Sequence, residues 1–176
     1  RRDLEFMFPA HELTSEQIVA TMALLPLTAE FGERFQYNNQ MVATGGFAAA
    51  MADGGSPHAL GQSYATALRD RVLNPLGMTR TTLSLQDVVA DGDYAVPHAS
   101  DLEYRPVPLP PMVDDTWIAP VAPTGGLWST AREMAAYLKM ELAHGLAPDG
   151  ERVVSSDNLD ATWQPGVPMN FGDTAP

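Results

Sequence analysis

Tyr37 and Asn39 stand two residues apart, directly before a stretch rich in alanine and glycine. A tyrosine hydroxyl fixed at such a junction and open to solvent can pass a proton to or from a reacting group. The same residues also fit a structural role, because a tyrosine before a helix can pack against it and asparagine is a competent N-cap. Tyr37 and Asn39 are therefore candidate catalytic residues, with packing and capping as the alternative.

The 176 residues hold no simple nucleophile motif to accompany this tyrosine. A Gly-x-Ser-x-Gly elbow is absent, and Lys139 does not stand three residues after any serine. Ser129 has Arg132 at that spacing, but a guanidinium stays charged and cannot act as a base at ordinary pH. We interpret Ser129 as part of the start of a helix.

The sequence predicts neither a cofactor nor a metal site. It has no cysteine, which excludes disulfides and thiol catalysis, and it has no His-Glu-x-x-His motif. The glycine pairs at Thr44–Gly46 and Thr124–Gly126 lack the Gly-Lys-Ser/Thr ending of a phosphate-binding loop. The four histidines are far apart along the chain: His11, His58, His98 and His144.

Charge and hydropathy exclude two further classes of partner. The formal net charge of −12 repels phosphate backbones, so we expect no nucleic-acid binding. No apolar run approaches the roughly 20 residues of a membrane-spanning helix.

The chain opens Arg1-Arg2-Asp3, without Met and without a hydrophobic signal segment. A processed N-terminus or a start inside a longer protein would both look like this, and the localisation stays open.

The residue pattern predicts about five helices with little strand. Capping-box spacing marks two helix starts, at Thr14 with Gln17 and at Thr130 with Glu133. Pro26 ends the first of these helices, and Gly145 is a plausible C-cap for the other. The expected helices span residues 14–25, 39–52, 63–73, 130–142 and 156–163.

The helix expected at 39–52 should be central and buried. Gly45 and Gly46 lie inside it, and glycines weaken a helix unless another backbone packs close to them. Residues 74–78 form a tight turn, short extended pieces at 94–98 and 104–109 could pair as a hairpin, and residues 164–176 read as an irregular tail.

Four blocks in order resemble the serine β-lactamase and penicillin-binding-protein superfamily, in its class C and esterase branch. They match its Tyr-x-Asn element, its Pro-Leu-Gly-Met-x-x-Thr turn, its Ala-Pro-x-Gly-Gly-Leu and Ser-Thr segment, and its Asp-Gly-x-x-Val-Val-Ser passage. Two positions depart from the family pattern: Phe31 stands where a proline is usual, and Glu133 stands where Asp is common. The blocks are residues 37–39, 71–81, 122–134 and 145–155.

The resemblance implies a fold in which an α/β domain and a mostly helical domain enclose the active site. This chain maps onto the helical domain, so residues 1–176 are expected to be a single helical subdomain, mainly α. In the family, the serine of a Ser-x-x-Lys motif attacks a carbonyl and forms an acyl-enzyme, which water releases. Tyr37 would be the proton shuttle, and the Asn39 amide would orient the substrate or the lysine.

The resemblance also implies that part of the site lies elsewhere. Ser-x-x-Lys is expected before residue 1, and Lys-Thr-Gly or His-x-Gly after residue 176. Because a tyrosine has an ordinary pKa of about 10, it needs cationic neighbours from these motifs to serve as a base. We therefore expect an internal fragment that is inactive when isolated.

Three hypotheses follow. The first is part of a serine hydrolase that acts on an ester, an amide or a β-lactam. The second is a non-catalytic helical module with a binding or structural role, motivated by the absent nucleophile. The third is self-association, because a domain separated from its neighbour should expose an apolar face.

Overall fold

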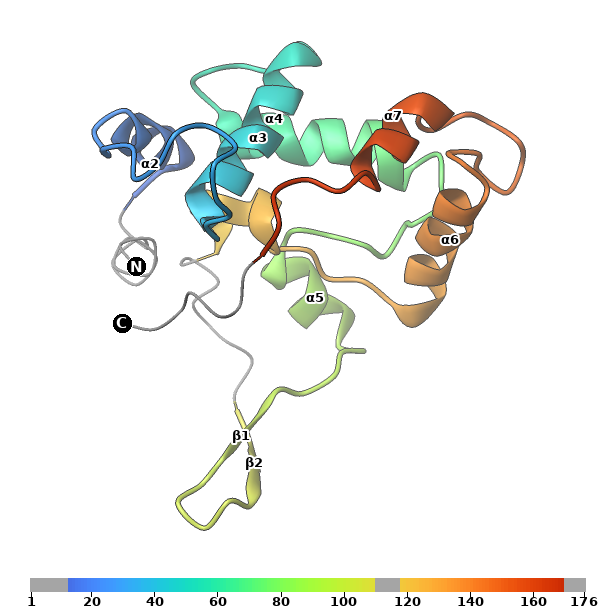
Figure 1. The fold of residues 1–176 in the computed structure, drawn as a ribbon. Coiled ribbons are helices and arrows are strands. Elements are labelled where there is room, and N and C mark those ends of the chain that lie inside the picture. The colour runs from blue at the N-terminus through green and yellow to red at the C-terminus, as the bar shows by residue number, and fades with distance from the viewer. Residues whose placement is uncertain (1–12, 110–117, 170–176) are drawn as a thin grey trace.

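The computed structural model describes residues 13–109 and 118–169 (Figure 1). The described chain is mainly helical, as the sequence predicts, with a single short pair of antiparallel strands. In order, the elements are α2 (Ser15–Met22), α3 (Asn39–Ala52), α4 (Leu60–Leu68), the π-helix η2 (Arg69–Leu73), α5 (Leu85–Asp91), β1 (His98–Ser100), β2 (Pro106–Pro108), the 3-10 helix η4 (Ala119–Thr124), α6 (Ala131–Leu142) and α7 (Ser156–Thr162).

Helix α3 is the centre of the first hydrophobic cluster. Phe47 is 2% exposed and meets Tyr64 of α4 edge to face, with ring centroids 6.3 Å apart. Ile18 of α2 and Val121 of η4 close the cluster from the other helices. The predicted central position of this helix is confirmed, although Met41 and Val42 in its first turns point outward and are exposed.

Only one of the two helix glycines has the close neighbour that the sequence predicts. A Cβ on Gly46 would lie 2.5 Å from the Cβ of Pro123, so glycine is needed for η4 to pack against α3. A Cβ on Gly45 would meet nothing within 4 Å. The predicted close approach is therefore found at Gly46, where the neighbour is a proline side chain and not a backbone, and it is absent at Gly45.

A second hydrophobic cluster joins the end of η2 to α6. One side of this cluster consists of Leu73, Leu76 and Met78, from the end of η2 and the turn predicted at residues 74–78. Gly77 in this turn has a φ of 65°. Met140 of α6 and Ala147 supply the other wall. The end of η2 and the turn that follows it therefore pack together against α6.

Helix α6 begins and ends differently from a simple capping pattern. Thr130 is the N-cap and accepts from the Glu133 amide at 3.2 Å, but the Glu133 side chain does not return the bond. The predicted capping box is therefore half formed. At the other end, the amides of His144 and Gly145 bond to the carbonyls of Glu141 and Met140, which is a Schellman motif, with His144 in the left-handed region at φ 50°.

The remaining helix predictions are close in position but incomplete. The expected capping box at Thr14 and Gln17 is present. The helix expected at 63–73 starts at Leu60 and changes to a π-helix at Arg69. Helices α5 and η4 were not expected, although Ser84 and Asp87 give α5 a side-chain N-cap. Both are short, and η4 contains Pro120 and Pro123, which a helix pattern disfavours.

The hairpin β1–β2 projects away from the helices (Figure 1) and its strands are exposed. His98 pairs with Pro108, so β1 begins where the expected strand ends. Residues 164–169 contain neither helix nor strand; Arg1–Asp3, His11 and residues 170–176 lie outside the described residues. None of the helices described is both long and apolar enough to cross a membrane.

Candidate functional site

The two candidate residues lie at the N-terminal end of α3. Asn38 is the N-cap, in an extended conformation with φ −151°, and its Oδ1 accepts from the Met41 amide at 2.9 Å. The capping role considered for Asn39 is therefore wrong by one residue. Asn39 is instead the first helical residue and is 8% exposed, whereas Tyr37 lies outside the helix and is 66% exposed.

This arrangement separates the two side chains by environment. Tyr37 presents its hydroxyl where a bound molecule can reach it, which is the condition for transferring a proton. Asn39 is held in the first turn beside the buried Gln40, whose carbonyl accepts from the Thr44 hydroxyl at 2.8 Å. The helix start is thus ordered by its cap and by local hydrogen bonds, and of the two candidate residues only Tyr37 faces outward.

The loop that leads to Tyr37 is ordered but apolar on its surface. The Thr28 hydroxyl donates to Gln36 Oε1 at 2.8 Å, and Arg34 donates to the Thr28 carbonyl at 2.8 Å. These bonds close residues 28–36 into a compact loop. Large hydrophobic side chains are exposed between the end of α2 and the first turns of α3: Leu24, Leu27, Phe31, Phe35, Met41 and Val42.

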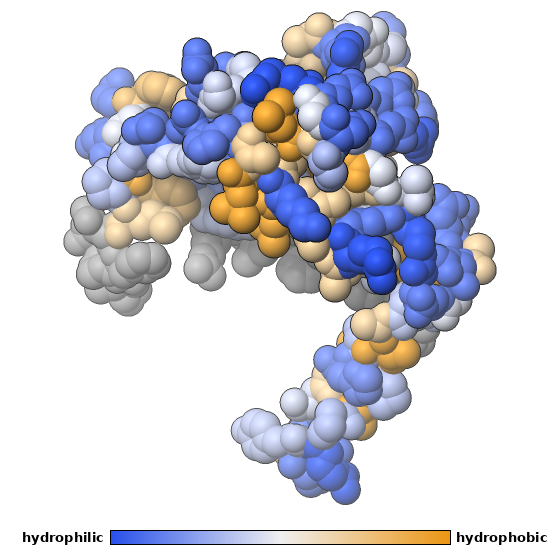
Figure 2. All heavy atoms as spheres, turned by 90° about the vertical axis from the view of Figure 1, so that its right-hand side faces the viewer, coloured by the Kyte–Doolittle hydropathy of each residue, from blue (hydrophilic) through white to orange (hydrophobic). Residues whose placement is uncertain are grey.

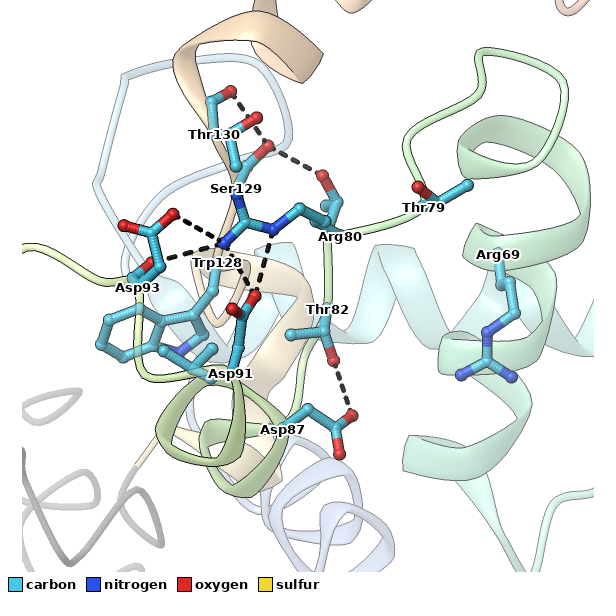
Figure 3. Close-up of a pocket in the computed structure, with 12 residues that line it drawn as sticks. Arg69, Thr79, Arg80, Thr82, Asp87, Asp91, Asp93, Trp128, Ser129 and Thr130 are labelled. Atoms are coloured by element: carbon cyan, nitrogen blue, oxygen red, sulfur yellow. Dashed lines mark hydrogen bonds and ion pairs between the residues drawn. The ribbon is translucent and has the colours of Figure 1, made fainter.

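A cleft of about 400 Å³ lies elsewhere, between η2, α5 and the approach to α6 (Figure 3). Neither Tyr37 nor Asn39 lines it. Arg80 crosses the cleft to Asp91 at 2.7 Å and Asp93 at 3.1 Å, and its hydrogen bond to Asp91 raises the pKa of the guanidinium. Since these charges satisfy one another, the network fastens the end of α5 to the turn before it.

The cleft wall near α6 is built on a buried carboxylate. Glu133, 9% exposed, accepts from the Arg80 amide at 2.9 Å and from the Thr81 hydroxyl at 2.5 Å. Because Thr81 donates to Glu133, it must accept from Ser129, whose Oγ is 2.8 Å away (Figure 3). The Ser129 hydroxyl is therefore held in a structural chain at the start of α6, in agreement with its interpretation from sequence.

Two further features bear on possible ligands. Across residues 13–109 and 118–169, no three His, Asp or Glu side chains converge as metal ligands. His98 Nδ1 lies 2.8 Å from the Val96 carbonyl, and His144 Nδ1 lies 3.1 Å from Asp160. Both histidines are thus engaged in local contacts.

Sequence reasoning missed Asn38 and the partners of Glu133. Asn38 could have been identified, since an asparagine before a helix is as good a cap as the one after it. The bonds from Glu133 to residues 80 and 81 have no sequence signal, because the partners are 53 and 52 positions away.

Known proteins resemble this chain in sequence and in structure. The family model described as Beta-lactamase matches residues 2–173. Penicillin-binding protein 4 of Amycolatopsis lactamdurans is 35% identical over 96 residues, which cover 54% of this chain and 24% of that protein. The octameric penicillin-binding protein homologue from Pyrococcus abyssi matches with a TM-score of 0.65 and 29% identity, over 87% of this chain and 30% of that one.

The matches cover a larger share of this chain than of either relative. The chain spans about a quarter of the length of the curated relative, at 24%, and a similar share of the solved structure, at 30%. The family match, in contrast, includes almost all of the 176 residues. The chain belongs to the beta-lactamase family.

Proposed function

We propose that this chain is the helical wall of an acyl-transfer site in a serine hydrolase that cleaves an ester, an amide or a β-lactam. Tyr37 is the proton shuttle, and the Asn39 amide orients the substrate or the neighbouring lysine. The nucleophile belongs to a Ser-x-x-Lys motif outside these 176 residues, on a segment that packs over the start of α3.

The observation that carries the proposal is the placement of Tyr37. Its side chain is 66% exposed, one residue before an N-cap that fixes the backbone at the start of α3. A tyrosine needed only for packing would lie against the helix. The exposed apolar side chains around it, from Leu24 to Val42, are what a second domain would cover.

The proposed reaction splits acyl transfer into two steps. The serine oxygen attacks the carbonyl while its proton passes to the tyrosine oxygen, and the tyrosine then protonates the leaving group. Water hydrolyses the acyl-enzyme by the reverse proton path. Cationic neighbours would be required, because they favour the phenolate form that accepts the proton.

The test compares the isolated 176 residues with the complete protein. A fluorophosphonate probe, a chromogenic ester and a chromogenic cephalosporin are applied to both. We expect labelling and turnover only in the complete protein, and we expect Tyr37→Phe there to lower kcat by about 10²–10⁴-fold. Tyr104→Phe is the matched control, since Tyr104 is an exposed tyrosine on the hairpin. Retention of full activity by Tyr37→Phe would refute the tyrosine's role.

The alternative is a non-catalytic helical module, which is favoured by the lack of a Ser-x-x-Lys motif in these residues. The same probes decide between the two. A complete protein that neither reacts with the fluorophosphonate nor hydrolyses the ester would support the module. Labelling of the isolated chain at any serine would contradict both readings.

We also propose self-association of the isolated chain through the apolar surface from Leu24 to Val42. The solved relative is octameric, and an uncovered apolar surface favours association in water. Light scattering across a concentration series should show a rising mass, and Leu27→Asp should reduce it. A strictly monomeric profile at every concentration would refute the proposal.

A further inference from the structure

Helix α6 has an outer face that is as apolar as its inner one. Glu133 and Met140 point into the molecule, and Tyr137 is half-buried between them. On the opposite side, Leu138 is 56% exposed and Leu142 is 81% exposed. The outer face of α6 consists of five exposed residues: Ala131, Met134, Ala135, Leu138 and Leu142.

This face departs from the usual pattern of a surface helix. A helix on the outside of a globular protein carries polar residues on its outer side. Here Met134, Leu138 and Leu142 recur every four residues, so they form one continuous stripe. The second hydrophobic cluster takes Met140 and Tyr137 from α6 and includes no residue of this stripe. Figure 2 looks at the molecule from the side on which α6 lies in Figure 1, and hydrophobic residues there lie directly beside hydrophilic ones.

Charges of opposite sign border the two long edges of this face. Arg132 and Lys139 are seven residues apart, which places both on one edge, and both are exposed. Within the described residues, neither one pairs with a carboxylate. Glu141 lies on the other edge, where it is hydrogen-bonded to the Tyr137 side chain. The free cationic edge is therefore the one that can select a partner.

A second copy of α6 does not fit this face well. In an antiparallel pair, each edge meets the same edge of the other helix, so Arg132 and Lys139 would face cations, which is unfavourable. A parallel pair would set these two cations against a single carboxylate, Glu141, because Glu133 is the other acid of α6 and is buried in the molecule.

We propose that the outer face of α6 docks an amphipathic helix of a partner protein, with an apolar stripe against Leu138 and an acidic flank along Arg132 and Lys139. In helix docking of this kind, apolar side chains at helical spacing supply the contact, and the flanking charges set the choice of partner. The site is independent of Tyr37 and of the proposed hydrolysis.

The probes are two synthetic amphipathic helices that share one leucine stripe. One carries Glu along the flank and the other carries Lys at the same positions. Fluorescence anisotropy with the 176-residue chain should show the Glu peptide binding at least about tenfold more tightly than the Lys peptide. Added salt should weaken this preference, because the flanking charges are solvent-exposed.

Variants of exposed residues keep the test independent of folding. Leu138→Asp should abolish binding of both peptides, and Arg132→Glu combined with Lys139→Glu should reverse the preference. Arg69→Glu is the matched control, an exposed cation on η2 rather than on α6 that forms no ion pair in the described part of the chain, and it should change nothing. Circular dichroism confirms that each variant is folded.

Two results would overturn the proposal. Equal binding of the two peptides, or no binding of either, would show that the cationic edge does not select a partner. A concentration-dependent dimer of the wild-type chain that Leu138→Asp dissolves would assign the face to a second copy instead.

Discussion

The two hydrophobic clusters of this chain are held together by different means. Around α3, helices pack directly on helices, with Phe47 against Tyr64 and Gly46 against Pro123. Around α6, the end of η2 and the turn after it meet the helix, and the Glu133 carboxylate bonds to residues 80 and 81, which follow that turn. Apolar contact area therefore dominates the first region, and a buried polar bond network supports the second.

The difference matters for function because the candidate residues belong to the first region. Tyr37 and Asn39 stand at the start of a helix whose buried face is fixed by neighbours on several sides. A site that must hold a hydroxyl in place benefits from such rigid support. The α6 region instead offers an exposed face whose support comes from distant segments of the chain.

The largest effect is expected from Phe47→Ala. It removes a side chain that is 2% exposed from the centre of the first cluster, and the cavity should cost about 3–5 kcal/mol of the free energy of unfolding. Urea denaturation measures this loss. Leu142→Ala removes an equally apolar side chain that is 81% exposed and should change stability by less than about 0.5 kcal/mol. Similar losses in both variants would erase the distinction between the regions.

The second largest effect is expected from Glu133→Ala in the second region, which should lower the free energy of unfolding by about 2–3 kcal/mol. The reason is that the Arg80 amide and the Thr81 hydroxyl would lose a charged acceptor in a buried place. Glu133→Gln, which keeps an oxygen acceptor, should cost less. The control is Glu151→Ala, an exposed glutamate whose side chain makes no bond within the described residues. A Glu133→Ala protein as stable as this control would show that packing alone holds α6.

The same contrast explains what could be predicted from the sequence. The bounds of α3 follow from a local pattern, and the structure begins and ends this helix as expected at 39 and 52. The short helices α5 and η4 were missed, because seven and six residues carry too little periodicity to stand out. The polar bonds of Glu133 were missed for another reason, since they join positions more than 50 residues apart.

The candidate site was predictable to the same extent. The family pattern identifies Tyr37 and Asn39, and the structure places them together at one helix start. The prediction that Asn39 caps this helix was wrong, since Asn38 is the N-cap. The two residues have the same chemistry, and only the backbone conformation distinguishes them. The catalytic roles of Tyr37 and Asn39 remain a prediction.

Glu16 offers a smaller and pH-dependent test of the first region. Its Oε1 accepts from the Leu60 amide at 2.8 Å, which joins α2 to the start of α4, and this bond lowers the pKa of the carboxyl group. A lowered pKa stabilises the fold above the ordinary value of about 4.3, and the stabilisation is lost as the pH falls. Glu16→Gln should therefore reduce the loss of stability on acidification, whereas Glu151→Gln should leave it unchanged; urea midpoints between neutral and acid pH measure both.

Tyr137 should sharpen the comparison at the opposite end of the pH scale. Its hydrogen bond to Glu141, together with partial burial, raises the pKa of the phenol to about 12. Because the folded chain then holds this proton more tightly than the unfolded chain, stability is fully present below pH 10 and declines between about 10 and 12. Tyr137→Phe should flatten that decline in urea denaturation. Burial also raises the pKa of Tyr64 in the first cluster. Tyr64→Phe should therefore remove a separate part of the loss of stability at alkaline pH. If Tyr137→Phe leaves the alkaline slope unchanged, the Glu141 bond does not hold the proton in solution, and the edge of α6 opposite the cations is free to bind a partner as well.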